Sequence, residues 1–191
     1  MDLRKKDIAA HFQIRAAVSG AVHKHLRKEK FLEVQTPKII ASATEGGTSL
    51  FEMKYFDKTA YLAQSPQLYK QILMSGGLER VYEVGPAFRA EEHNTPRHLN
   101  EFISIDIEMS FADDDVVMGV MERLVDCAAR VVAKETEALE TLGIEPIELE
   151  LPLPRITYDE AIGMAKGKAK WGEDLSMEAT RAIAEQMNGF Y

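Results

Sequence analysis

Apolar residues near the start of the chain recur at the spacing of one helical face: Ile8, Phe12, Val18, Val22 and Leu26. This spacing predicts an amphipathic helix over residues 5–29. The apolar run that follows, FLEVQTPKII, contains Pro37, which has no N–H to donate to a central ladder, so we expect an edge or interface strand there. Residues 50–64 predict a hairpin that turns at Asp57-Lys58, because β-branched and aromatic residues lie on both arms.

A complete set of helix signals follows over residues 65–75. Ser65 is a candidate N-cap, Pro66 suits the first helical position, and Gly76-Gly77 predicts the end of the helix. The glycine-containing stretch SATEGGTS, before the hairpin, is typical of a loop.

Residues 80–90 and 101–111 predict the two clearest strands. The second strand alternates strictly, with Ile103, Ile105, Ile107 and Met109 on one face and Phe102, Ser104, Asp106 and Glu108 on the other. We therefore expect an antiparallel sheet that packs helices against its apolar face and opens a site on its polar face.

Residues 113–142 predict one long helix that begins with acidic residues and ends at Gly143. A capping box at Thr157–Glu160 and a cap at Ser176 predict two short helices near the end. Strands and helices do not alternate regularly, so the sequence predicts an α+β fold, an antiparallel sheet flanked by helices, in a single domain.

Composition narrows the class of protein. The 191 residues are 46% hydrophobic and 28% charged, as in an ordinary folded domain, and the net charge is −8. An acidic chain has no general affinity for nucleic acid, so phosphate binding would need a local basic cluster. One cysteine, Cys127, suits a reducing cytoplasm, and we see neither a membrane-length apolar run nor a secretory signal.

Residues 88–102, FRAEEHNTPRHLNEF, combine the groups that a nucleoside triphosphate needs. Arg89 can hold a phosphate with both arms of its guanidinium, and Phe102 can stack on a purine. Glu91 can accept from an exocyclic amine, while the cations further along the loop can gather the outer phosphates. By chemistry alone, a solvated hairpin whose charges pair with one another is an equally good interpretation.

The segment VYEVGPAFRAEEHNTPRHLNEFISIDIEM resembles motif 2 of the class II aminoacyl-tRNA synthetases, and in detail the aspartyl-tRNA synthetases of archaeal and eukaryotic type. FLEVQTPKII resembles their motif 1, SATEGGTSLF their flipping loop, and YLAQSPQLYKQ the segment that binds the amino acid. The resemblance divides residues 1–191, as a partial catalytic domain, into motif 1 at about 31–40, flipping loop 42–49, amino-acid segment 64–71 and motif 2 at about 81–111.

The resemblance implies a role for each matching residue. Arg89 is the implied catalytic residue, because it would contact both the α-phosphate and the carboxylate of aspartate. The implied aspartate site comprises Glu45, Gln67, Leu68, Tyr69, Lys70 and Arg89. The implied ATP site comprises Arg89, Ala90, Glu91, Arg97, His98, Leu99 and Phe102. Pro37 would lie at a homodimer interface.

Lys70 decides between two amino acids. By itself it is a helix lysine that could simply be exposed, but asparaginyl-tRNA synthetases, which resemble this region, carry no lysine there. A buried lysine without a counter-charge costs several kcal/mol, so we expect it to pair with the side-chain carboxylate of an acidic substrate. The sequence therefore predicts aspartate over asparagine.

Other family parts are not seen in the sequence. The resemblance implies ATP, Mg²⁺, L-aspartate and tRNA, but the acidic ligands of Mg²⁺ and motif 3 would lie beyond residue 191, so no metal ligand is assigned within this chain. We expect a fragment of the catalytic core with impaired activity. Two alternatives stay open: a paralogue that makes aspartyl-adenylate for a small-molecule reaction such as asparagine synthesis, and a non-catalytic dimerising module.

Overall fold

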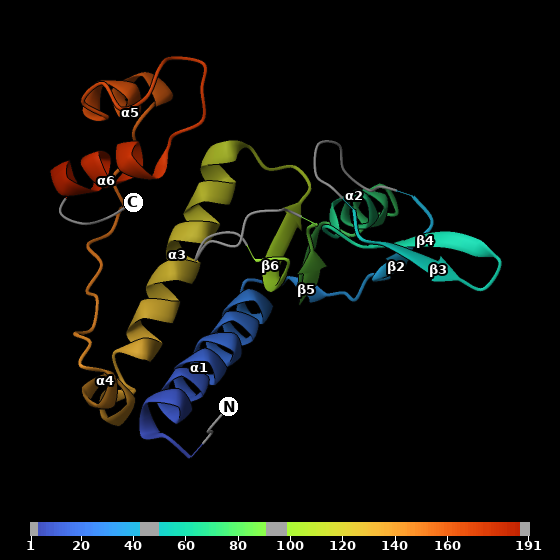
Figure 1. Ribbon diagram of the computed structural model, residues 1–191, viewed down its shortest axis with the longest axis horizontal. Coiled ribbons are helices and arrows are strands. Elements are labelled where there is room, and N and C mark those ends of the chain that lie inside the picture. Colours follow the sequence, from blue (N-terminus) through green and yellow to red (C-terminus); the bar gives the residue numbers. More distant parts are fainter. Residues whose placement is uncertain (1–3, 43–49, 91–98, 188–191) are drawn as a thin grey trace. The chain divides into compact units, whose positions relative to one another are not determined.

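The computed structural model describes residues 4–42, 50–90 and 99–187 (Figure 1). The chain forms two compact units, Met1–Leu149 and Glu150–Tyr191. The sequence suggested a single domain. The division falls in the proline-punctuated stretch before residue 157, which has no regular secondary structure, as is common at domain boundaries.

The central sheet of the first unit is built on one long hairpin. Strands β5 (Arg80–Phe88) and β6 (Glu101–Met109) pair antiparallel along their whole length, and the short strand β1 (Leu32–Glu33) adds to β5 in parallel. Both long strands appear where the sequence predicted them, and each ends two residues earlier than expected. The α+β class is confirmed.

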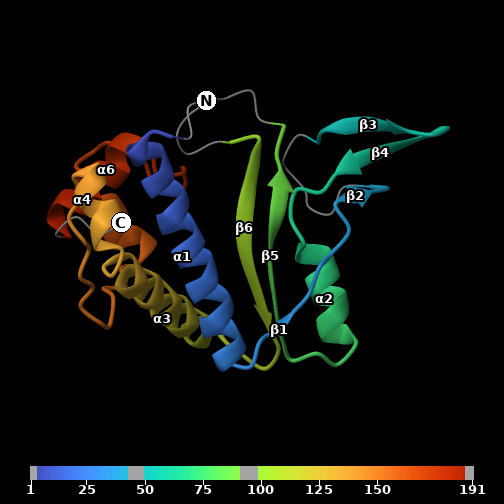
Figure 2. The same ribbon diagram turned by 90° about the horizontal axis from the view of Figure 1, so that it is seen from below.

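Helices α1 (Lys6–Lys28) and α3 (Asp114–Val132) lie side by side on one face of this sheet (Figure 2). The core between them consists of Val22, Leu26, Phe31, Tyr82, Val120 and Leu124. Each large apolar side chain buried there contributes roughly 1.5–3 kcal/mol. Ile107 and Met109 pack against this core, whereas Ile103 and Ile105 on the same face of β6 are 48% and 44% exposed.

A polar network crosses the edge of this core. The hydroxyl of the fully buried Tyr82 donates to Oε2 of Glu33 at 2.9 Å and lies 3.0 Å from Nδ1 of His23. Arg27 donates to the same Glu33 oxygen at 2.5 Å. That hydrogen bond, with help from Tyr82, lowers the pKa of Glu33, while burial raises the pKa of Tyr82. The network ties α1 to β1 and β5.

A second, smaller sheet has the order β2-β4-β3. Its strands are β2 (Ile39–Ile40), β3 (Glu52–Tyr55) and β4 (Lys58–Leu62). The sequence predicted one edge or interface strand in FLEVQTPKII. The segment instead supplies two short edge strands, one to each sheet, and Pro37 lies between them and outside both. The hairpin turn is at Phe56-Asp57, one residue earlier than expected, and Phe56 adopts a left-handed conformation with φ 56°.

Helix α2 (Gln67–Ser75) packs on the face of β5 and β6 opposite to α1 (Figure 2). Its first regular residue is Gln67, so Pro66 lies at the boundary instead of inside the helix. Ser65 still satisfies an orphan donor, because its hydroxyl accepts from the backbone N–H of Gln67 at 3.1 Å. Gly76 follows the last turn, as predicted.

The predicted long helix is two helices. It breaks after Val132, and α4 (Thr136–Leu142) follows before Gly143 ends it with φ 64°. No proline or glycine marks the break. The buried Ala138 and Leu139 belong to α4, which packs against α1, so tertiary packing decides the change of direction.

The second unit holds α5 (Tyr158–Met164) and α6 (Met177–Gln186), and both predicted caps are confirmed. Thr157 and Glu160 form the reciprocal capping box, and the Ser176 hydroxyl accepts from Ala179 N. Along the part of the chain that the structure describes, no helix has the length and apolar character required to span a bilayer.

Gly85 on β5 has little room for a side chain. A Cβ there would lie 3.1 Å from Oε1 of Glu83 and 3.6 Å from Cε of Lys38. We expect Gly85→Ala to lower the free energy of unfolding by about 1–2 kcal/mol in urea titrations. Gly20→Ala is the matched control, since a Cβ there meets nothing within 4 Å in mid-helix and should stabilise by about 0.5–1 kcal/mol. Equal effects from the two substitutions would contradict the crowding argument.

The lowered pKa of Glu33 predicts acid-sensitive stability. Its contribution is complete above its unfolded value near 4.5 and is lost as the pH falls through the lower folded-state pKa. Glu33→Gln should therefore destabilise the chain at pH 7, and the gap from the parent should close below about pH 4.5. Thermal unfolding across this range measures the gap, with Glu52→Gln, at an exposed position, as control. A gap that is independent of pH would refute the assignment.

Candidate active site

The polar face of the β5–β6 hairpin carries carboxylates whose partner cations come from other segments of the first unit. Glu83 on β5 and Asp106 on β6 are direct cross-strand partners, and Gly85 stands opposite Ser104. Side chains of such partners lie on the same face, and like charges placed opposite each other are destabilising. Each carboxylate therefore needs its own cation, and each has one.

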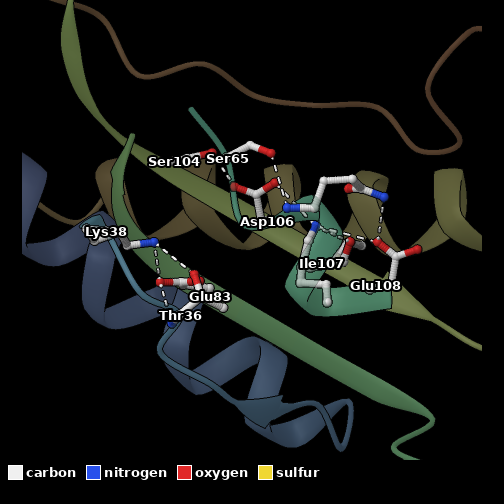
Figure 3. Close-up of polar contacts among 10 residues, drawn as sticks. Thr36, Lys38, Ser65, Glu83, Ser104, Asp106, Ile107 and Glu108 are labelled. Atoms are coloured by element: carbon white, nitrogen blue, oxygen red, sulfur yellow. Dashed lines mark hydrogen bonds and ion pairs between the residues drawn. The ribbon is translucent and has the colours of Figure 1, made fainter. Parts of the chain in front are cut away.

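Lys70 of α2 supplies the cation for Asp106, which is labelled in Figure 3 together with Ile107 and Glu108. Its side chain is only 2% exposed, and its ammonium lies 3.3 Å from Oδ1 of Asp106, 3.2 Å from the carbonyl oxygen of Ile107 and 3.6 Å from Oε2 of Glu108. From the sequence we expected a bound acid to supply the counter-charge of Lys70. In the structure, two carboxylates of the chain already do so.

Neighbouring polar groups orient this cluster. The Ser104 hydroxyl donates to Oδ2 of Asp106, the oxygen that Lys70 does not use. The side-chain amide of Gln67 donates to Oε2 of Glu108 at 3.3 Å. Because Gln67 donates through its nitrogen, its carbonyl oxygen remains the atom that can accept from a ligand.

Lys38 supplies the cation for Glu83, which is 1% exposed. Nζ of Lys38 lies 2.6 Å from Oε1 of Glu83. Thr36 adds two donors to the same carboxylate, its backbone N–H at 3.2 Å and its hydroxyl at 2.7 Å. Pro37, between these two residues, is exposed.

Arg89 follows β5 directly and carries an unused donor. Its guanidinium carbon lies 5.4 Å from the ring centroid of Phe102, which shares the face of Asp106. Its backbone N–H donates to the carbonyl of Asn100 at 3.0 Å. Among the residues that the structure describes, the buried Nε of Arg89 has no hydrogen-bond partner, and unpaired buried polar groups are rare in folded proteins.

The predicted site residues divide into three sets. Gln67 and Lys70 meet at the carboxylate pair, and Arg89 meets Phe102 at the end of the hairpin. Leu68 and Leu99 are exposed, and Tyr69 and Ala90 are half-buried, with no polar contact assigned to them. The remaining four, Glu45, Glu91, Arg97 and His98, lie outside the described residues.

Four charged residues around Lys38 and Lys70 were not predicted as site residues from the sequence: Lys38, Glu83, Asp106 and Glu108. For the two on β6 a signal existed, because alternation placed Ser104, Asp106 and Glu108 on the face expected to open toward a site. Lys38 and Glu83 carried no such signal. Their contact joins two segments distant in sequence.

The residues present fit a nucleotide better than a metal ion. Arg89, with its free donor beside an aromatic ring, has the chemistry for a phosphate and a base. Within residues 4–42, 50–90 and 99–187, no group of three or more His, Cys, Asp or Glu side chains could hold a metal ion.

Comparison with known proteins is consistent with this geometry. Residues 1–189 match the family described as tRNA synthetases class II (D, K and N), and the chain belongs to that family. The aspartate–tRNA(Asp/Asn) ligase of Archaeoglobus fulgidus is 55% identical over 100% of this chain and 45% of its own length. The aspartate–tRNA(Asp) ligase of Thermoplasma acidophilum is 51% identical over 100% of this chain and 46% of its own length.

Solved structures agree with the sequence relatives. The asparaginyl-tRNA synthetase of Pyrococcus horikoshii complexed with asparaginyl-adenylate superposes with a TM-score of 0.87 at 35% identity, over 96% of this chain and 44% of that protein. The aspartyl-tRNA synthetase of Entamoeba histolytica gives 0.79 at 35% identity, over 98% and 36%. The chain thus spans less than half the length of these relatives. The comparisons do not favour the small-molecule paralogue or the non-catalytic module.

Removing the Lys70 charge should expose the repulsion that it masks. We expect Lys70→Met to lower the free energy of unfolding by about 2–3 kcal/mol, because two partly buried carboxylates lose their cation. The triple variant with Asp106→Asn and Glu108→Gln should recover most of that loss, since no uncompensated charge remains. Urea titration measures both. A triple variant as unstable as the single one would show that packing, not charge, is responsible.

Proposed function

We propose that this chain forms the amino-acid and nucleotide sites of an aspartate–tRNA ligase. The observation that carries the proposal is the placement of a buried lysine, held by carboxylates, on the same face of one hairpin as an arginine with an unused donor. A dipolar amino acid joined to a nucleotide needs both. The names of the relatives favour aspartate as the amino acid.

Each end of the substrate has a complementary group. The side-chain carboxylate of aspartate would take hydrogen bonds from Lys70, whose ammonium presently spreads its donors over acceptors more than 3 Å away. The ammonium of the substrate would lie beside the carbonyl of Gln67, which Glu108 orients, and beside Glu45. Asp106 and Glu108 make this region favourable for a cation as well as for an acid held by Lys70.

Arg89 would act on the reacting atoms. ATP would stack its base on Phe102 and bring its α-phosphate to the guanidinium. A carboxylate oxygen of aspartate would then attack the α-phosphorus, the bond to the β-phosphate would break, and pyrophosphate would leave. Arg89 stabilises the charge that develops on the phosphoryl oxygens, and positioning does the rest, without a covalent protein intermediate. The aspartyl group would pass to the terminal adenosine of tRNA.

The wider setting follows from the same proposal. Mg²⁺ would accompany ATP, but no step is assigned to it through residues of this chain. Pro37 would lie at the interface with a second copy in a homodimer, which its exposure permits. The protein would act in the cytoplasm, as its single cysteine suggests.

Selectivity gives the sharpest test. We expect the chain to bind the non-hydrolysable sulfamoyl analogue of aspartyl-adenylate more tightly than the asparaginyl analogue, because a carboxylate forms stronger hydrogen bonds to an ammonium than an amide does. Lys70→Gln should lower affinity for the aspartyl analogue about 10- to 30-fold and remove most of the preference. Calorimetry measures both ligands.

Arg89→Gln is the matched variant for this experiment. It should weaken the two analogues equally, because both carry the same phosphate-like group and adenosine. A parent chain that binds neither analogue would refute the proposal. So would a Lys70→Gln variant that weakens the two analogues to the same extent.

A further inference from the structure

Lys38 makes two contacts that connect the two sheets. Its ammonium lies 2.6 Å from Glu83 on β5, and its backbone carbonyl accepts from Ala63, just after β4, at 2.9 Å. The carbonyl of Ala63 in turn accepts from the N–H of Phe88 at the end of β5, at 3.0 Å. Lys38, Ala63 and β5 thus form a closed ring of contacts.

The two segments that carry the proposed site begin at different residues of this ring, one at Ala63 and the other at Phe88. From Ala63 the chain runs through Ser65 into α2, which carries Lys70. From Phe88 the next residue is Arg89. The separation of Lys70 from Arg89 therefore depends on how the end of β4 is held against β5. The backbone bond between Ala63 and Phe88 holds one point, and the side chain of Lys38 braces a second point along β5.

Charge adds a second link between Lys38 and the site. Glu83 lies opposite Asp106, the carboxylate that Lys70 holds (Figure 3). Without Lys38, the charge of Glu83 would be buried beside Asp106 with only the Thr36 donors, and it would compete for the ammonium of Lys70. Lys38 thereby leaves the ammonium of Lys70 bonded to Asp106 and Ile107 on β6.

We infer that Lys38 is a positioning residue that fixes the separation between the amino-acid half and the nucleotide half of the site. It would act through its contact with Glu83 and not on a ligand directly. This inference rests on the proposed function for its consequence, but its structural content, the placement of α2 relative to the end of β5, can be measured without a ligand.

A positioning role can be distinguished from a general loss of structure by comparing ligands that occupy one half of the site with a ligand that occupies both. A joined ligand gains over its parts only when the two subsites are correctly spaced. We expect Lys38→Met to weaken the sulfamoyl analogue of aspartyl-adenylate about tenfold or more, while AMP alone and L-aspartate alone each change by less than about twofold. Lys38→Arg, which can still bind Glu83, should restore most of the affinity for the joined ligand.

Two further variants serve as controls. Arg123→Met removes another ion pair of the first unit, between Arg123 and Glu29, and should leave all three affinities unchanged. If Lys38→Met unfolds because Glu83 is left buried and unpaired, the double variant with Glu83→Gln removes both charges and should show the same selective loss. A loss shared equally by AMP, L-aspartate and the joined analogue would overturn the inference, as would no loss at all.

Spin labels test the placement directly. Cysteines introduced at the exposed positions Ile72 on α2 and Glu101, the partner of Phe88, in a Cys127→Ser background report the distance between the two halves. We expect Lys38→Met to shift or broaden the distance distribution and Lys38→Arg to reverse the change. An unchanged distribution overturns the inference whatever the ligands do. A parent chain that binds no analogue counts against the proposed function alone, and the distance measurement then decides this inference.

Discussion

Two carboxylates, Glu83 and Asp106, lie opposite each other on adjacent strands of the same hairpin. Like charges so placed repel each other, and a buried carboxylate without a partner costs several kcal/mol. Two lysines from outside the β1-β5-β6 sheet neutralise these charges: Lys38 pairs with Glu83, and Lys70 pairs with Asp106. The second sheet and α2 are needed for this, because Lys38 directly precedes β2 and Lys70 lies on α2.

The two faces of the β5–β6 hairpin have different roles: one packs against the apolar core, and the other carries the charged residues of the proposed site. One face packs Tyr82 and Ile107 toward α1 and α3, where apolar burial supplies most of the favourable free energy. The other face carries the lysine–carboxylate pairs and faces α2. Gly85 belongs to this second face, where the absence of a side chain leaves room for Glu83 and Lys38. A strand with a side-chain period of two can serve both faces at once.

The charges on the polar face suit a ligand that is both acidic and basic. Glu108 adds a carboxylate to the two that the lysines already balance, so the cluster can attract an ammonium while Lys70 still offers donors to an acid. Arg89 lies beside Phe102, and its buried Nε has no hydrogen-bond partner within the described part of the chain. The likeness to class II synthetases, several of them aspartate–tRNA ligases, agrees with this distribution of charge.

Local pattern was sufficient for most of the secondary structure. The strict alternation in β6, the capping box at Thr157 and the proline in the edge segment each act over a few residues, so the sequence alone determined them. The same alternation placed Asp106 and Glu108 on the face of a site, although it did not identify what they bind. The family resemblance added Lys70 and Arg89 as candidates.

Tertiary structure decided what distant segments do to one another. The break between α3 and α4 has no local signal and follows from the packing of α4 on α1. Lys70 obtained its counter-charges from β6 and Lys38 obtained Glu83, 45 positions away, because the sheets bring these segments together. Sequence spacing determines which face a side chain occupies, whereas the energy of a buried charge depends on which other segment arrives beside it.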